Sequence, residues 1–499
     1  MSSSIVHQVL RGGPPRAITR SDIVEPNRLQ GFSDAVFATA ATLLIVPVRK
    51  FEMEQDETLK AALLRQWPQF TVFLLGYLVI CTLWESHFVR YKVLAKVDDV
   101  LVAMNLVSLM IVTFLPFSVN LEGHFAKYET SVLLNAGLLL ALELCELAMF
   151  IYGFSNPVLL SARFQALEES EKRVKRHQIY IKVLLNCCLF LLAAIFSFAS
   201  FVVAYILICS VLLTPFMKRI IIKLTELSAQ CRFHDTVSTF EVLTGRIDKE
   251  RLECFTDAAV AIVATLLILD LTTEDFPTEQ EVEREGLVEA LKRLKQLFIS
   301  YVGTYVTVAI QWFIHHSVVH HLHIFTPILV VINRTFLAFV AFTPFLSTLN
   351  NKYTGHVSSD AQTAVGFSSI ILFMGSFTNV LMIIVALFKP DINLVDWARP
   401  RDNGNTALIY LTIKALVIPV MAFLTFVISL SGLEASYLVY HVCMYATPVV
   451  LILLKVGYAC HWRHVGDVQH EEEQLTEEEN MEGNGEEEEG TNEGVAVVI

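Results

Sequence analysis

The sequence predicts an all-α polytopic membrane protein with twelve transmembrane helices in two parallel six-helix repeats. Apolar residues make up 54% of its 499 residues and charged residues only 17%, whereas a soluble domain has about 25% charged residues. The mean hydropathy is +0.54. Apolar runs recur along the chain, and most approach the roughly 20 residues that a helix needs to cross a bilayer. The chain also repeats itself, and this repetition determines how the runs are grouped.

Two segments of the chain are closely similar. Residues 28–45 read RLQGFSDAVFATAATLLI and residues 251–268 read RLECFTDAAVAIVATLLI, with eleven of eighteen positions identical. Three later residues return 228 positions further on: Trp84 as Trp312, His87 as His315 and Asn105 as Asn333. A duplicated membrane unit of roughly 220 residues explains all of these pairs.

The apolar runs place six spans in each unit. In the first unit they lie near residues 30–48, 67–89, 99–119, 131–153, 179–198 and 200–217. In the second unit they lie near residues 253–271, 296–318, 325–347, 365–388, 408–430 and 435–458. An even number of spans returns the chain to its starting side, so the repeats run parallel rather than inverted.

The polar segments divide the chain into five parts. We expect a cytosolic N-terminus at 1–27, the first repeat at 28–218, a cytosolic linker at 219–250, the second repeat at 251–460 and a tail at 461–499. Basic residues such as Arg90, Lys92 and Arg163 follow the second and fourth spans, which places both termini in the cytosol. From residue 465 the tail has thirteen acidic residues and no Lys or Arg, so we expect it to be disordered.

The polar residues do not form a catalytic set. There is no paired nucleophile and base at helical spacing, so the sequence predicts no enzyme and no cofactor. For the five histidines from His315 to His323, a cluster at the cytosolic membrane edge is favoured over a metal site. The expected partner is the lipid bilayer, with no nucleic acid. The sequence does not identify cytosolic regulators.

Arg28 and Asp34 lie on the first helix of the first unit, and Arg251 and Asp257 repeat them in the second. Because they are six residues apart, the Arg and the Asp point to different sides of their helix and do not pair with each other. Ionisable groups inside a membrane are costly and usually face the bundle interior. The repeated Trp, His and Asn residues are their expected partners. Such a network either locks the first helix into its unit or makes gating sensitive to pH.

A second face of the two opening helices has small, hydroxyl and apolar side chains. Ala35, Thr39, Thr42 and Val46 share one stripe, and Ala258, Ile262, Thr265 and Leu269 share the matching one. An uncharged stripe of this kind suits a pore wall. Small residues and threonine are equally favoured where membrane helices pack together, so the residues alone leave both interpretations open.

The doubled motif resembles a known family. Arg28-x-x-x-Phe32-Ser33-Asp34 and Arg251-x-x-x-Phe255-Thr256-Asp257 are similar to the signature of the endolysosomal potassium channel family of transmembrane protein 175. The resemblance covers about residues 28–460. It implies a homodimer in endosomal and lysosomal membranes, in which two copies of each opening helix surround a central potassium pathway with pseudo-fourfold symmetry. It also implies that protons pass when the lumen is acidic.

The resemblance further implies where the pore is narrowest. The family has an isoleucine on each opening helix, three residues before a threonine. Ile262 precedes Thr265 in this way, whereas Thr39 takes the place of the isoleucine before Thr42. We therefore expect a pore lined by Thr39, Ile262, Thr42, Thr265, Val46 and Leu269, with one diagonal wetter than the other.

An ion-coupled secondary transporter with a midplane site is the alternative function. Transporters are also built from repeats, and Glu143 and Glu146 in the fourth span are the candidate coupling carboxylates. The chain has no TVGYG-like loop, so a ring of backbone carbonyls is not available as a potassium filter.

Overall fold

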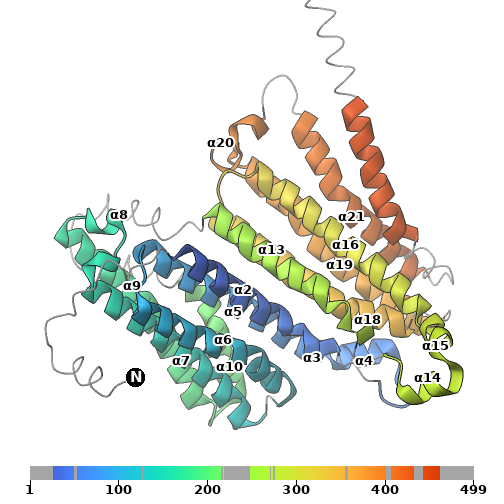
Figure 1. Cartoon of the computed structure of the whole chain (residues 1–499), viewed down its shortest axis with the longest axis horizontal. Coiled ribbons are helices and arrows are strands. Elements are labelled where there is room, and N and C mark those ends of the chain that lie inside the picture. Colours follow the sequence, from blue (N-terminus) through green and yellow to red (C-terminus); the bar gives the residue numbers. More distant parts are fainter. Residues whose placement is uncertain are drawn as a thin grey trace, which may run out of the picture.

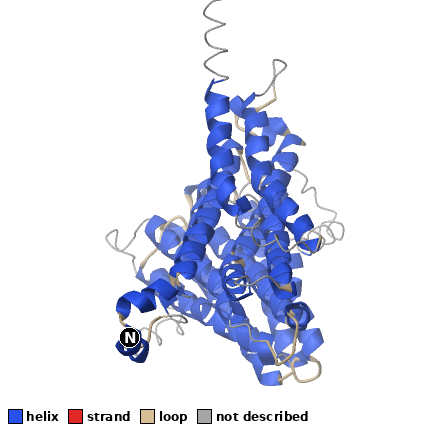
Figure 2. Ribbon diagram, turned by 90° about the vertical axis from the view of Figure 1, so that its right-hand side faces the viewer, coloured by secondary structure: helices blue, strands red, loops and turns tan. Residues whose placement is uncertain are grey.

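The computed structural model describes residues 26–49, 53–125, 127–214, 217, 248–269, 271–272, 276–353, 358–400, 406–431 and 442–460. Within these ranges the regular elements are helices (Figure 2). Two bundles lie on either side of a central pair, α2 (Asn27–Leu43) and α13 (Lys249–Leu266) (Figure 1). Nearly all of the expected N-terminal segment and linker, and the whole acidic tail, lie outside the described residues.

The first repeat forms the bundle coloured blue to green in Figure 1. Its long helices are α2, α5 (Trp67–Val93), α6 (Asp99–Phe125), α7 (Glu129–Ser155) and α9 (Glu169–Phe196), and its shorter ones are α3 (Ile45–Arg49), α4 (Leu59–Arg65), η2 (Pro157–Leu159), α8 (Ala162–Gln165), α10 (Phe201–Cys209) and η3 (Ser210–Leu213). Helix α3 continues the line of α2 after a break at Leu44. Pro47 explains the break, because it has no N–H to donate to the carbonyl of Leu43.

The second repeat forms the bundle coloured yellow-green to red (Figure 1). Its helices are α13, α14 (Glu279–Glu285), α15 (Leu287–Arg293), α16 (Lys295–His321), α17 (Pro327–Val340), α18 (Thr343–Tyr353), α19 (Ser359–Leu387), α20 (Pro390–Asn393), η5 (Asp396–Ala398), α21 (Thr406–Leu430) and a last helix over Val442–Cys460. Here the third span is broken between α17 and α18. Pro344 lies in the first turn of α18, where a missing N–H is tolerated.

The all-helical polytopic class is confirmed, and the number of spans is confirmed in part. Within the described ranges, ten helices are long and apolar enough to cross a membrane. The span predicted at 200–217 is a short helix over Phe201–Leu213. The span predicted at 253–271 is α13, which begins at Lys249 and has five charged side chains among its 18 residues.

Equivalent loops pair in both repeats. Leu94 and Leu160 form an isolated antiparallel bridge between the loops after α5 and α7, and Leu322 and Leu394 form the same bridge after α16 and α19. In each repeat these contacts join the end of the second span to the end of the fourth. The two halves of the chain therefore share this loop contact as well as the motif.

The bundles bury their ionisable groups within an apolar core and expose large apolar side chains on their outer faces. Large apolar side chains such as Phe114, Phe117 and Phe198 are more than half exposed, whereas Arg90 and Glu146 are buried. A helical protein in lipid has this distribution, because polar groups in contact with hydrocarbon would lack partners.

Candidate functional site

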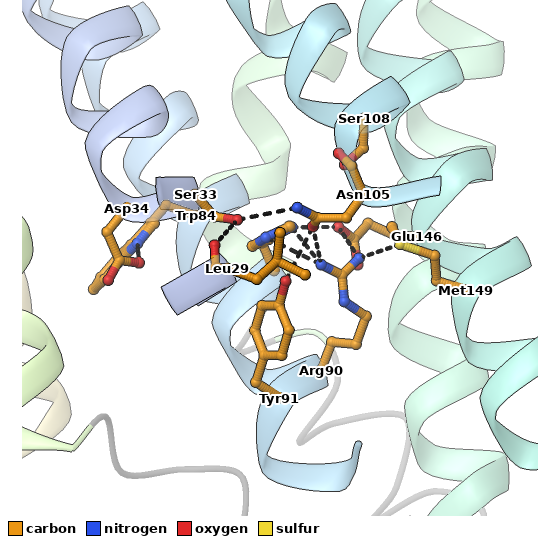
Figure 3. A network of polar contacts seen from close by, with 11 residues as sticks. Leu29, Ser33, Asp34, Trp84, Arg90, Tyr91, Asn105, Ser108, Glu146 and Met149 are labelled. Atoms are coloured by element: carbon orange, nitrogen blue, oxygen red, sulfur yellow. Dashed lines mark hydrogen bonds and ion pairs between the residues drawn. The ribbon is translucent and has the colours of Figure 1, made fainter. Parts of the chain in front are cut away.

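Asp34 lies near the middle of α2 and is buried between the two repeats. Its Oδ1 accepts a hydrogen bond of 2.8 Å from Trp84 Nε1 on α5 (Figure 3). Its Oδ2 lies 3.0 Å from Arg251 Nη2 on α13. The ring of Trp84 stacks on Phe255 of α13, with the ring centroids 4.2 Å apart. The opening helix of the second repeat is therefore attached to two residues of the first repeat by an ion pair and an aromatic stack.

The matching site of the second repeat has the tryptophan hydrogen bond but lacks the ion pair within the described residues. Trp312 Nε1 donates a hydrogen bond of 2.7 Å to Asp257 Oδ1, as in the first repeat. Asp257 is exposed, however, and no cation of the described residues pairs with it. Arg28 is also exposed, and it has no hydrogen-bond or ion-pair partner within the described ranges. Phe32 is 52% exposed. The Arg and the Phe of the first motif thus lack the contacts that their counterparts make.

The hydroxyl residue of each motif contacts an asparagine of its own repeat. Asn105 Nδ2 on α6 donates to Ser33 Oγ over 3.2 Å. Asn333 Nδ2 on α17 donates to Thr256 Oγ1 over 3.1 Å. All four residues are buried. This part of the network holds each opening helix against the third span of its own repeat.

A buried ionic cluster lies behind Ser33 in the first repeat (Figure 3). His87 Nδ1 lies 2.6 Å from Glu146 Oε1, and Arg90 Nη1 lies 3.0 Å from the same oxygen. Arg90 Nη2 also donates to Asn105 Oδ1 over 2.6 Å. Removing one partner of such a cluster leaves an uncompensated buried charge, which costs about 3–5 kcal/mol. The cluster therefore fixes α5, α6 and α7 to one another.

The placement of Arg90 in a cytosolic loop was wrong. Helix α5 continues to Val93, so Arg90 is one turn inside the helix and 1% exposed. The pairing of Arg90 with Glu146 was also not predicted from the sequence. One signal for it was present, because His87 and Arg90 are three residues apart and so share one face of a helix.

The second repeat is neutral at the corresponding place. His315 Nδ1 lies 2.8 Å from Asn379 Oδ1, so an amide replaces the carboxylate that His87 contacts. Val318 is buried where the 228-residue spacing puts the counterpart of Arg90. Among the other histidines of this segment, His316 stacks on Trp312, and no three His, Cys, Asp or Glu side chains of the described residues are arranged to hold a metal.

The predicted pore stripe is mostly accessible on the surface of the chain. Five of its six residues keep exposed area: Thr39, Val46, Ile262, Thr265 and Leu269. Thr42 is 0% exposed, and its hydroxyl donates to Ala38 O over 2.9 Å within α2. Packing inside the chain therefore explains Thr42 better than a place on an open wall.

The exposed threonines of this stripe leave their oxygen lone pairs available. Thr39 Oγ1 donates to Ala35 O over 2.7 Å, and Thr265 Oγ1 donates to Ile262 O over 2.8 Å. In both, the hydroxyl proton is used by the helix's own backbone. The remaining lone pairs can accept a hydrogen bond or contact a cation.

Comparison with known proteins identifies the family. Residues 28–116 and 251–344 match the model of a family described as the endosomal/lysosomal potassium channel TMEM175. In these two stretches the chain matches the TMEM175 family. The two matched stretches are the opening segments of the two repeats, so the doubled motif is a doubled TMEM175 unit. This is a channel family, and the prediction that the chain is not an enzyme is confirmed.

Several relatives resemble this chain over different lengths. An endosomal/lysosomal proton channel TMEM175 of Danio rerio is 29% identical over 440 residues, which are 86% of this chain and 83% of the relative. A potassium channel of Streptomyces collinus is 37% identical over 105 residues, which are 21% of this chain and 51% of that protein. The crystal structure of a lysosomal potassium-selective channel TMEM175 homolog from Chamaesiphon minutus covers 42% of this chain and 97% of its own, with 20% identity and a TM-score of 0.33.

Proposed function

We propose that this chain is a potassium-selective channel of endosomal and lysosomal membranes that also passes protons when the lumen is acidic. Ions would cross through a central pathway lined by α2, α3 and α13 of two chains in a homodimer. The names of the relatives support the ions and the membranes. The contacts that the opening helices leave incomplete within one chain support the dimer. These incomplete contacts are the observation that carries the proposal.

The contact between α2 and α13 has a direction. Within one chain, Arg251 and Phe255 of α13 bind Asp34 and Trp84 of the first repeat. The reverse contact would place Arg28 and Phe32 of α2 on Asp257 and Trp312 of the second repeat, and the described residues do not make it within one chain. A second copy of the chain can supply it.

Two copies would close the arrangement into a ring. Arg28 of each chain would pair with Asp257 of the other, and Phe32 of each chain would cover Trp312 of the other. A two-fold dimer of this kind repeats one contact four times around the axis, twice within chains and twice between them. The pairing also removes two unpaired charges from the surface of each chain, where they are costly in a membrane protein.

The lining we propose for this ring is a narrow and partly apolar neck. Ile262 and Leu269 supply apolar surface, while Thr39 and Thr265 supply hydroxyl oxygens with free lone pairs. A neck of this kind removes water from the ion and can also close by dewetting. Potassium gives up its water more readily than sodium, so it crosses at a lower cost. Thr42 would support the wall from behind.

The rest of the proposed organisation follows the sequence. The two remaining helices, Phe201–Leu213 and α13, complete twelve spans in parallel repeats at 28–218 and 251–460. Both termini, the linker at 219–250 and the acidic tail at 461–499 would lie in the cytosol. In this orientation α6 runs from the cytosol towards the lumen, since basic residues precede it and few follow it.

The alternative of a coupled transporter has less support. Glu146 is held by His87 and Arg90, and Glu143 accepts a hydrogen bond of 2.7 Å from Asn186. Both carboxylates are buried inside the first-repeat bundle and are bound by its own side chains. Saturable flux with a fixed stoichiometry would favour a transporter, whereas currents that follow the potassium gradient favour a channel.

Recording from enlarged endolysosomes under reversed potassium and sodium gradients tests the proposal. We expect the reversal potential to follow the potassium gradient and to change little when sodium is exchanged for an impermeant cation. Cells without the chain are the control. A current that follows sodium equally well, or flux that saturates without a reversal potential set by potassium, would contradict potassium-selective conduction.

A further inference from the structure

Glu122 is a buried carboxylate of the first repeat that takes no part in the network around Asp34. It lies on α6, three residues before the helix ends at Phe125, and it is 2% exposed. Its Oε2 accepts a hydrogen bond from Asn135 Nδ2 on α7, and Asn135 Oδ1 in turn accepts one of 3.0 Å from Ser118 Oγ. Its Oε1 is buried and has no hydrogen-bond partner. A buried oxygen left in this state costs free energy unless a donor reaches it.

A small cavity adjoins Glu122. Its volume is about 20 Å³, enough for a single water molecule. Glu122, Asn135, the Tyr205 hydroxyl and the Cys209 thiol are its polar lining, and the side chains that α5 contributes are apolar. Tyr205 and Cys209 on α10 are thus the titratable groups that face the carboxylate. One water here could donate a hydrogen bond to the free oxygen.

The second repeat shows that the fold does not need a carboxylate at this position. The 228-residue spacing puts Asn350 in the place of Glu122. Ser368 Oγ on α19 donates to Asn350 Oδ1 over 3.1 Å, and both residues are buried. The same helix contact is therefore made by a neutral pair. The acid in the first repeat is a difference in chemistry between two otherwise similar bundles.

We propose that Glu122 and its cavity form a proton-binding site of the first repeat, facing the lumen and separate from the ion pathway. A hydronium ion would transfer its proton to Oε1 and leave a water molecule in the cavity. The protonated carboxyl can donate a hydrogen bond where the carboxylate only accepts. Buried ionisable groups in membrane proteins commonly mark proton sites.

One packing contact connects this site to the opening helix. Val119 lies one turn before Glu122 on α6 and packs against Gly76 of α5. A Cβ atom at Gly76 would lie 2.8 Å from Val119 Cγ1 and 3.5 Å from Leu44 Cδ1. Leu44 is the residue at the break between α2 and α3. A shift of α6 on protonation would therefore reach the pathway through α5, so that luminal pH regulates the current; this step rests on the proposed channel function.

The test compares three variants of the full-length channel at neutral and acidic luminal pH. Glu122→Gln holds the site in a neutral form, so its potassium current at neutral luminal pH should equal the wild-type current at acidic luminal pH. The several-fold change in current that we expect between the two pH values in the wild type should be absent from this variant. Tyr205→Phe should reduce that change. Glu129→Gln, which neutralises an exposed acid at the start of α7, should keep it. A wild-type pH response in Glu122→Gln would overturn the proposal.

A second measurement does not depend on current. Infrared difference spectra of the purified wild-type protein between neutral and acidic pH should contain a carboxylic-acid carbonyl band that Glu122→Gln removes and Glu129→Gln retains. A band unchanged by Glu122→Gln would contradict proton binding at this site. If the wild type conducts no potassium while the band is lost in Glu122→Gln, the channel function fails and the proton site stands.

Discussion

Asp34→Asn should destabilise the protein more than any other single neutralisation in the opening helices. The change removes the carboxylate that pairs with Arg251 Nη2 at 3.0 Å and leaves that guanidinium between the repeats without its counter-charge. Breaking a buried pair in this way costs about 3–5 kcal/mol. The free energy of unfolding in detergent and the yield of folded protein should both fall, and thermal unfolding of purified protein measures the loss.

Asp257→Asn is the matched control for this prediction. It is the equivalent change in the second repeat, but Asp257 is exposed on the chain, and its hydrogen-bond partner among the described residues is Trp312. The folded chain should therefore keep almost its full stability, while association of two chains weakens. Equal unfolding temperatures for Asp34→Asn and wild type would show that the Asp34 pair does not hold the repeats together.

Ile262→Asn should raise the current and lower the preference for potassium over sodium. An amide in the neck would hold water there, so ions would pass with more of their hydration and the dewetting barrier would fall. Thr39→Ile should act in the opposite direction, because it completes an apolar ring and lowers the open probability. Surface-matched currents and reversal potentials under bi-ionic conditions measure both effects.

Ile262→Leu is the control for the neck, since it keeps an apolar side chain of the same volume and should preserve selectivity. A packing role for the stripe leads to a different result. In that case Ile262→Asn would weaken assembly and abolish the current, because a polar group would be buried without a partner. Reversal potentials unchanged in all of these variants would remove the stripe from the pathway.

The sequence predicted the features that depend on one helix or one repeat. The 228-residue spacing identified Asn105 and Asn333, and the structure shows each of them bound to the hydroxyl residue of its own motif. The apolar runs located the long helices to within a few residues at many ends. These properties follow from periodicity and from duplication, which a single sequence contains.

Contacts between helices far apart in the sequence could not be predicted in this way. Asp34 finds its cation on α13 of the other repeat, and nothing in the spacing of residues says which face of α2 meets that helix. The positive charge of Arg90 favours a loop position. In the structure, contacts with Glu146 and Asn105 offset the free-energy cost of burying this charge. Thr42 shares a stripe with Thr39, yet the packing of the whole bundle buries it. Each of these depends on how helices are placed around one another.

The central claim is that two chains complete each other's opening-helix contacts around the ion pathway. Its most direct test is to co-express two differently tagged chains, one with Arg28→Glu and one with Asp257→Arg. Each variant alone would bring like charges together at both contacts between chains. In the mixed dimer, one contact joins the two introduced charges and the other joins the two native ones, so both are attractive. The control exchanges the charges of the intrachain pair, with Asp34→Arg and Arg251→Asp. Assembly and current should be restored only when both of these changes are in the same chain.

The measurement is co-purification of the two tags together with potassium current. We predict that neither Arg28→Glu nor Asp257→Arg assembles or conducts alone, and that together they form mixed dimers and restore the potassium current. Failure of the two chains to rescue each other, or wild-type assembly by either variant alone, would contradict a pathway built between two chains.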